Sequence, residues 1–249
     1  ITRGKRLYGA KVIPNRGAWL EFGMDATGCI WVRIDRKRKV AATSLLRAFG
    51  ITSDGDIEDK FADLEAKSAI KYIEATIKRD TAKSQPEGLI EVYRRIRPGD
   101  LATADNARSL INAMFFNFDR YDLSRVGRYR FNQLFSEDLE IIKENRVLRP
   151  EDVIHTMRRI IELAMSEGEP DDIDHLANRR VRAIGELLAN RVRIGLARME
   201  RIVVDRMSTL DMTTLTPAQL INNRPIVGVV KEFFMSSQLS QFMDQTNPL

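Results

Sequence analysis

The first 40 residues consist of short apolar runs separated by turn-like segments rich in Pro, Asn, Asp and Gly. The runs are 12–13, 18–22 and 29–35, and the turns are 14–17 and 25–28. In the last run the apolar residues Ile30, Val32 and Ile34 alternate with Trp31, Arg33 and Asp35. A period of two places the first three toward a core and the others outward. This pattern predicts an N-terminal antiparallel β-hairpin region.

From Thr43 onward the apolar residues are spaced by three or four, which indicates helices. We expect helices at 43–49, 63–79, 89–96, after an N-cap at Thr103, from Pro150 to near Gly168, at 181–207 and from Thr216, and a further apolar run at 226–234. The segment 83–88 is expected to be a loop inside one domain. The longest helix, 181–207, carries arginines on its polar face. The fold class is therefore α+β, a hairpin region followed by a mostly helical part and a long arginine-rich helix.

Charge changes this picture, because the net charge of +5 is unevenly distributed. Residues 1–40 hold ten Lys and Arg against three Asp and Glu, and residues 177–206 hold eight Arg against three acids. Clustered cations suit a polyanion such as nucleic acid, and the excess of Arg (29) over Lys (11) favours bidentate phosphate or base contacts. The clearest run is Arg36, Lys37, Arg38 and Lys39, a candidate DNA-backbone contact. The alternative is solvated helix faces with local ion pairs.

Catalytic chemistry has little support. No dinucleotide, nucleotide-triphosphate, serine-hydrolase or zinc-protease motif occurs, and the single Cys29 excludes an intrachain disulfide and a multi-cysteine zinc site. We therefore assign no catalytic residue and no metal site. Three aspartates and His175 within 171–175 leave one alternative open, a stand-alone metal-dependent nuclease. The favoured interpretation is a helix-capping turn. No apolar stretch is long enough for a membrane span, so no membrane partner is expected.

Five blocks of the sequence, in the same order, resemble the bacterial RNA polymerase β subunit. They are 13–22 (IPNRGAWLEF), 32–38 (VRIDRKR), 120–129 (RYDLSRVGRY), 171–187 (beginning DDIDHLANRRVR) and 233–249 (containing SSQLSQFMDQTNPL). The resemblance implies a fragment with residues 1–172 as the β lobe and 173–183 as a connecting turn at the DNA fork. Residues 184–235 would be part of the protrusion, and 236–249 the start of the rifamycin-binding loop.

The resemblance also implies a function in DNA-templated transcription. The fragment would line the downstream DNA cleft and contact non-template DNA and the RNA:DNA hybrid. It would be part of a nucleotidyltransferase but inactive alone, because the β′ subunit holds the catalytic Mg²⁺ and this fragment holds no cofactor. Its partners would be the β′, α, ω and σ subunits and transcription factors that dock on the lobe or protrusion. Its location would be the bacterial cytoplasm, at the nucleoid.

Two sets of site residues come from the resemblance. The residues that match a pocket for a flipped non-template base are Trp19, Ile173, Asp174 and Arg179. The residues that match the rifamycin and hybrid region are Gln238, Leu239, Ser240, Gln241, Phe242 and Asp244. An indole offers a stacking surface, and Asp and Arg can hydrogen-bond a base edge. A nucleic-acid-binding module outside the polymerase and a protein-binding adaptor are the remaining alternatives.

Overall fold

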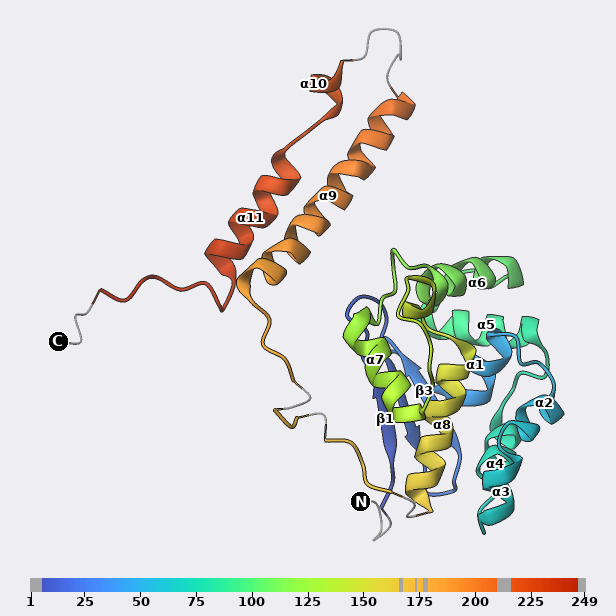
Figure 1. Cartoon of the computed structure of the whole chain (residues 1–249). Coiled ribbons are helices and arrows are strands. Elements are labelled where there is room, and N and C mark those ends of the chain that lie inside the picture. The colour runs from blue at the N-terminus through green and yellow to red at the C-terminus, as the bar shows by residue number, and fades with distance from the viewer. Residues whose placement is uncertain (1–5, 166–167, 173, 177–178, 210–215, 246–249) are drawn as a thin grey trace. The chain divides into compact units, whose positions relative to one another are not determined.

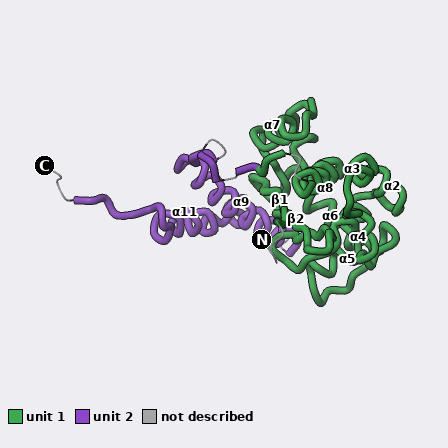
Figure 2. The backbone as a smooth tube through the Cα atoms, turned by 90° about the horizontal axis from the view of Figure 1, so that it is seen from below, with its two compact units in different colours: residues 1–170 green, residues 171–249 purple. Residues whose placement is uncertain are grey.

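The computed structural model describes residues 6–165, 168–172, 174–176, 179–209 and 216–245. The chain divides into two compact units, residues 1–170 and residues 171–249 (Figure 2). In the described ranges, no helix combines the length and the apolar character that crossing a bilayer requires.

A four-stranded antiparallel sheet opens the first unit (Figure 1). Its strands follow chain order: β1 (Gly9–Val12), β2 (Leu20–Met24), β3 (Ile30–Ile34) and β4 (Val40–Ala41). The predicted alternation is confirmed in β3, where Ile30, Val32 and Ile34 are buried, Arg33 is exposed and Trp31 is half-buried. One face of the sheet therefore forms core, and the other carries polar and aromatic side chains.

Helices supply the rest of the core, against the buried face of the sheet. In chain order they are α1 (Ala42–Ala48), α2 (Asp54–Asp59), α3 (Ala62–Lys67), α4 (Tyr72–Arg79), α5 (Gln85–Ile96), α6 (Ala104–Ile111), the π-helical η1 (Asn112–Phe116), α7 (Ser124–Phe135), the 3-10 turn η2 (Glu144–Arg146) and α8 (Pro150–Ala164). The predicted fold class, a hairpin region followed by a mostly helical part, is confirmed.

The single helix expected at 63–79 is wrong, because the chain forms α3 and α4 with a break at 68–71. The hydroxyl of Ser68 accepts the backbone N–H of Ile70 at 3.2 Å, a local bond that competes with helix continuation. The carboxylate of Glu65 then accepts the N–H of Ile73 at 3.0 Å, near the start of α4. The break lets Leu64 and Ile73 both enter the core.

Helices α5 and α7 also differ from expectation, and α2 was not among the expected helices. Helix α5 begins at Gln85, so part of the expected loop 83–88 forms its first turn, where Pro86 needs no N–H partner. Helix α7 was not expected from the apolar pattern. Its fully buried side chain is Arg128, Phe131 is half-buried against the core, and Val126 and Tyr129 are exposed. A charged residue in the buried position removes the apolar period that would have predicted a helix.

Two buried ion pairs connect these helices. Both guanidinium Nη atoms of Arg128 donate to the carboxylate of Asp152 in α8, at 2.7 and 2.8 Å. Asp152 also accepts the backbone N–H of Arg149 at 2.9 Å, which caps α8. The second pair joins Arg47 of α1 to Asp80 at 3.3 Å. All four paired side chains are fully buried, so each charge depends on its partner.

The second unit contains α9 (Ile184–Thr209), α10 (Pro217–Leu220) and α11 (Arg224–Ser236). Helices α9 and α11 lie side by side (Figures 1 and 2). Gly195 of α9 makes this possible, because a Cβ there would lie 2.8 Å from Val229 and 3.1 Å from the Cα of Ile226. The long arginine-rich helix expected at 181–207 is thus observed at 184–209.

Replacing Asp152 with Asn should lower the free energy of unfolding by about 3–5 kcal/mol, because it leaves the buried Arg128 guanidinium without a counter-charge. Urea unfolding followed by circular dichroism measures this change. Glu151→Gln, at the neighbouring position with a 52% exposed side chain, is the matched control and should cost less than about 1 kcal/mol. Equal losses in the two variants would contradict a structural role for the pair.

The second unit should cause self-association of the isolated chain, because it exposes large apolar side chains such as Val204 (61%) and Met235 (81%). Sedimentation velocity should show an average mass that rises with concentration. Glu at both positions should shift the chain toward monomer. Val126→Glu, at an exposed valine of the first unit, should have no such effect. A strictly monomeric unmodified chain at high concentration would show the expectation to be wrong.

Candidate nucleic-acid interface

Trp19 lies immediately before β2, next to the turn that follows β3. Its carbonyl accepts the backbone N–H of Asp35 at 2.8 Å, which extends the β2–β3 pairing by one residue. Its half-buried indole lies beneath the guanidinium of Arg36, whose central carbon is 4.6 Å from the ring centroid. The structure therefore joins one residue expected to stack on a base with one expected to contact DNA phosphate. The register of β2 against β3, which the sequence did not predict, brings Trp19 and Arg36 together.

The turn that carries Arg36 has an unusual backbone. Asp35 and Arg36 have φ of 48° and 61°, and the N–H of Lys37 donates to the carbonyl of Ile34 at 2.9 Å. Positive φ at two successive residues is the pattern of a tight hairpin turn, in which Asp is a common residue and Arg is not. The side chains of all four basic residues expected at this turn, Arg36, Lys37, Arg38 and Lys39, are exposed. The turn therefore presents a concentrated positive charge at the end of the sheet.

A second indole, Trp31, lies on the open face of the sheet. It covers Gly23 of the neighbouring strand, where a Cβ would come within 2.4 Å of the ring. Arg33 and Lys39 lie 5.1 and 5.8 Å from its centroid. The open face therefore carries two indoles, each beside cations, which is the composition of a surface that binds single-stranded nucleic acid. The period of two predicted that Trp31 faces outward, but not its cationic neighbours.

The acidic turn brings together two of the other expected pocket residues. Arg179 donates to the carboxylate of Asp174 at 3.1 Å, and both side chains are largely exposed, 67% and 80%. Ile173, the fourth expected member, lies outside the described residues. Asp174 and Arg179 belong to the second unit and Trp19 to the first. The structure therefore shows the pairing of Asp174 with Arg179, while their meeting with Trp19 stays a prediction.

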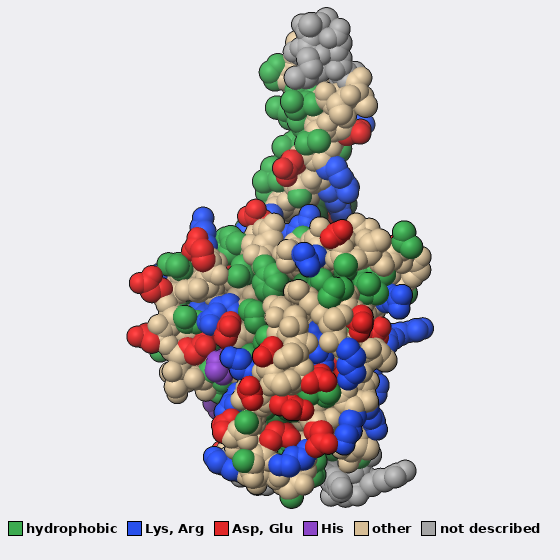
Figure 3. Space-filling model, turned by 90° about the vertical axis from the view of Figure 1, so that its right-hand side faces the viewer, with side chains coloured by type: hydrophobic (Ala, Val, Ile, Leu, Met, Phe, Trp, Pro, Cys, Tyr) green, Lys and Arg blue, Asp and Glu red, His purple; other side chains and the backbone are tan. Residues whose placement is uncertain are grey.

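Arginines on α9 differ in their availability. Arg191, Arg198 and Arg201 are exposed, and none of them has a salt bridge to the described part of the chain. Arg180 lies just before α9 and donates two hydrogen bonds to the carboxylate of Glu186 in the helix. These bonds lower the pKa of the Glu186 carboxyl. Over the first unit, by contrast, the face drawn in Figure 3 mixes both signs of charge. The hairpin turn and α9 therefore each present several exposed cations.

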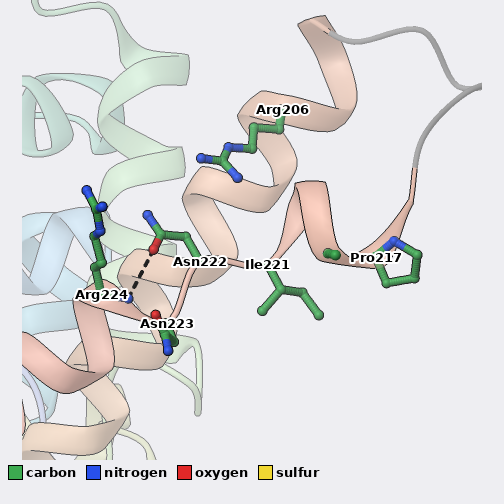
Figure 4. Close-up of a pocket in the computed structure, with 7 residues that line it drawn as sticks. Arg206, Pro217, Ile221, Asn222, Asn223 and Arg224 are labelled. Carbon is green, nitrogen blue, oxygen red and sulfur yellow. Dashed lines mark hydrogen bonds between the residues drawn. The ribbon is translucent and has the colours of Figure 1, made fainter.

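A hollow of about 680 Å³ in the second unit was not expected from the sequence. Its lining residues are Arg206, Pro217, Ala218, Ile221, Asn222, Asn223 and Arg224. Figure 4 shows Asn222 and Arg224 toward one side and Pro217 and Ile221 toward the other. The backbone N–H of Arg224 donates to the Asn222 side chain at 3.0 Å. The lining holds two arginines and no carboxylate, so it suits an anion better than a cation.

The residues expected in the rifamycin and hybrid region follow α11 in a turn. The N–H of Ser240 donates to the carbonyl of Ser237 at 3.1 Å, and its hydroxyl donates to that of Phe234 at 2.8 Å. Ser240 is half-buried, and the other expected members are exposed: Gln238, Leu239, Gln241, Phe242 and Asp244. Five of these six side chains are therefore exposed, and the function of the segment stays a prediction.

The metal-dependent nuclease needs a cluster of ligands. In the parts of the chain that the structure describes, no group of three or more His, Cys, Asp or Glu side chains is arranged to hold a metal ion. Asp174 instead pairs with Arg179. The geometry of the acidic turn thus offers the nuclease interpretation no support.

Comparison with known proteins agrees with the resemblance. The profile of the family described as RNA polymerase Rpb2, domain 2, matches residues 2–182. A Gloeobacter violaceus protein named DNA-directed RNA polymerase subunit beta is 48% identical over 248 residues, which are 100% of this chain and 22% of that protein. Proteins of the same name from Syntrophomonas wolfei and Thermosynechococcus vestitus are 52% and 48% identical over 246 residues. Each match covers 99% of this chain and 22% or 21% of the relative.

The chain therefore spans about a fifth of the length of the curated relatives it matches. The family profile covers more than half of the chain, and the relatives are about half identical along almost all of it. The resemblance inferred from the five sequence blocks is confirmed: the chain belongs to the RNA polymerase β-subunit family.

Proposed function

We propose that the chain is the part of the β subunit that lines the downstream DNA cleft and contacts non-template DNA and the RNA:DNA hybrid during transcription. The observation that carries this proposal is the open sheet face, where Trp19 and Trp31 lie beside Arg36, Arg33 and Lys39. Indoles supply stacking surfaces for unpaired bases, and the cations supply phosphate contacts. Family membership supports the assignment of this surface to DNA.

The proposal divides the chain into four parts: the β lobe (1–172), a connecting turn at the fork (173–183), part of the protrusion (184–235) and the start of the rifamycin-binding loop (236–249). Trp19, Ile173, Asp174 and Arg179 form the pocket for a non-template base. Arg and Asp together can satisfy both donors and acceptors on a guanine edge. When the base enters the pocket, bonds to the base replace the hydrogen bond between Arg179 and Asp174.

The same proposal assigns the assembly. The chain works as part of a DNA-directed RNA polymerase, with the β′, α, ω and σ subunits and with factors that dock on the lobe or protrusion. It acts in the bacterial cytoplasm at the nucleoid. The β′ subunit holds the Mg²⁺ ions of the reaction. This chain's residues bind and orient nucleic acid and take no part in the chemical step.

In the assembled polymerase, Trp19→Ala should remove about 1–3 kcal/mol of stacking on one unpaired base, and Arg179→Ala a base-edge contact of similar size. Both variants should shorten the open-complex lifetime on templates with the preferred base. They should also reduce the difference in lifetime between templates that carry different bases at that position. Open-complex decay on templates that differ only at one non-template base measures this effect.

Arg38→Ala is the matched control. Arg38 is exposed on the same turn and has no contact with an aromatic ring in the described structure. Its loss should weaken DNA binding equally on all templates. It should also reduce the salt dependence of the binding constant by about the amount that one phosphate contact contributes. If the Trp19 and Arg179 variants behave like Arg38→Ala, these residues do not read a base.

The isolated chain should neither synthesise RNA on a primed template with Mg²⁺ and nucleoside triphosphates nor cleave DNA. Primer extension and a nuclease assay with and without EDTA test both expectations, with intact polymerase and a metal-dependent nuclease as positive controls. Template-dependent synthesis would overturn the assignment of catalysis to another subunit. EDTA-sensitive cleavage that Asp174→Asn abolishes would instead support the nuclease.

A further inference from the structure

Arg36 combines an unfavourable backbone with a specific side-chain contact. Its φ of 61° lies in the left-handed region, and that of its neighbour Asp35, 48°, does too. The turn is closed by the N–H of Lys37, which donates to the carbonyl of Ile34 at 2.9 Å. The result is a guanidinium held 4.6 Å from the centroid of the Trp19 ring. Positive φ at both central residues is what a tight hairpin turn requires, whereas the position of the guanidinium over the ring is not required by the turn.

The position of Arg36 conflicts with base stacking on the same side of Trp19. A cation within about 6 Å of the centroid covers the face of the ring. A base that stacks on an indole needs such a face as well. The hydrogen bond between Asp35 N–H and the Trp19 carbonyl, 2.8 Å, fixes the backbone of both residues. A base can therefore stack on this face of Trp19 only after the guanidinium has left it.

We propose that Arg36 is an internal competitor for the face of Trp19 on which an unpaired base stacks. The inference rests on the base contact proposed above for Trp19. In the free chain the guanidinium covers the ring, and an arriving base displaces it toward the phosphates. Arg36 thereby acts as a positioning and specificity residue, because a base enters only if it stacks better than the guanidinium. A basic residue of the turn thus does more than add charge.

Three substitutions separate this function from simple electrostatics. Trp31→Phe leaves Trp19 as the one tryptophan of a chain that has two, and it is the background for the other variants. Arg36→Asn removes the guanidinium but suits the left-handed turn, since Asn adopts that conformation readily. Arg38→Asn removes the same charge from the same turn, where the structure shows no contact of Arg38 with an aromatic ring.

The first measurement is quenching of Trp19 fluorescence by acrylamide, a neutral quencher, in the free chain. Arg36→Asn should increase the quenching constant, and Arg38→Asn should leave it close to that of the background. Circular dichroism checks that each variant is folded. Equal quenching in the two variants overturns the inference, because the guanidinium would then not cover the ring. Base-induced quenching of Trp19 that persists in that case leaves the proposed function intact.

The second measurement is binding of a single-stranded oligonucleotide of about eight nucleotides, compared with an abasic strand of the same length. On the abasic strand the two variants should bind equally. On the base-containing strand Arg36→Asn should bind about two- to fivefold more tightly than Arg38→Asn, the fold-change that corresponds to an exposed cation–π contact. Weaker binding by Arg36→Asn overturns the competition. If Arg36→Asn uncovers the ring but no base-containing strand quenches Trp19, the proposed base contact fails, and the competition fails with it.

Discussion

The buried ion pair between Arg128 and Asp152 joins separate segments of the first unit. Arg128 also donates to the carbonyls of Asn145 and Val147, so one guanidinium joins α7, η2 with the residue after it, and α8. Burial, and then the charge of Asp152, raises the pKa of the Tyr121 hydroxyl, which lies in the same core. The interior here is polar, and its geometry is set by directed bonds as well as by volume.

Apolar periodicity predicted the parts of the fold in which burial is apolar. The strand with Ile30, Val32 and Ile34 is an example, and the long helix through Gly195 is another. It failed at α7, whose buried residue is Arg128, and at the break between α3 and α4, which depends on one serine hydroxyl and one glutamate side chain. Such features depend on hydrogen bonds between individual atoms, and no pattern of apolar positions encodes them.

The candidate site shows the same division. Asp174 and Arg179 are five residues apart, so their pairing follows from a local turn, and the resemblance identified both. The contact between Trp19 and Arg36 depends on the register of β2 against β3, which places Asp35 opposite Trp19. Sequence reasoning assigned these residues to two separate functions, a stacking pocket and a phosphate contact. The register shows that they form one arrangement.

Gly195 fixes the point at which α11 packs closely against α9. It touches the first turns of α11 at Pro225, Ile226 and Val229, while the far end of that helix leads into the segment with Gln238. About ten residues of helix separate this contact from Ser236, a length of about 15 Å. A side chain at position 195 that tilted α11 by about 10° would displace the far end by about 2.5 Å. The contact of Gly195 near the start of α11 therefore constrains the direction in which that helix continues toward Gln238.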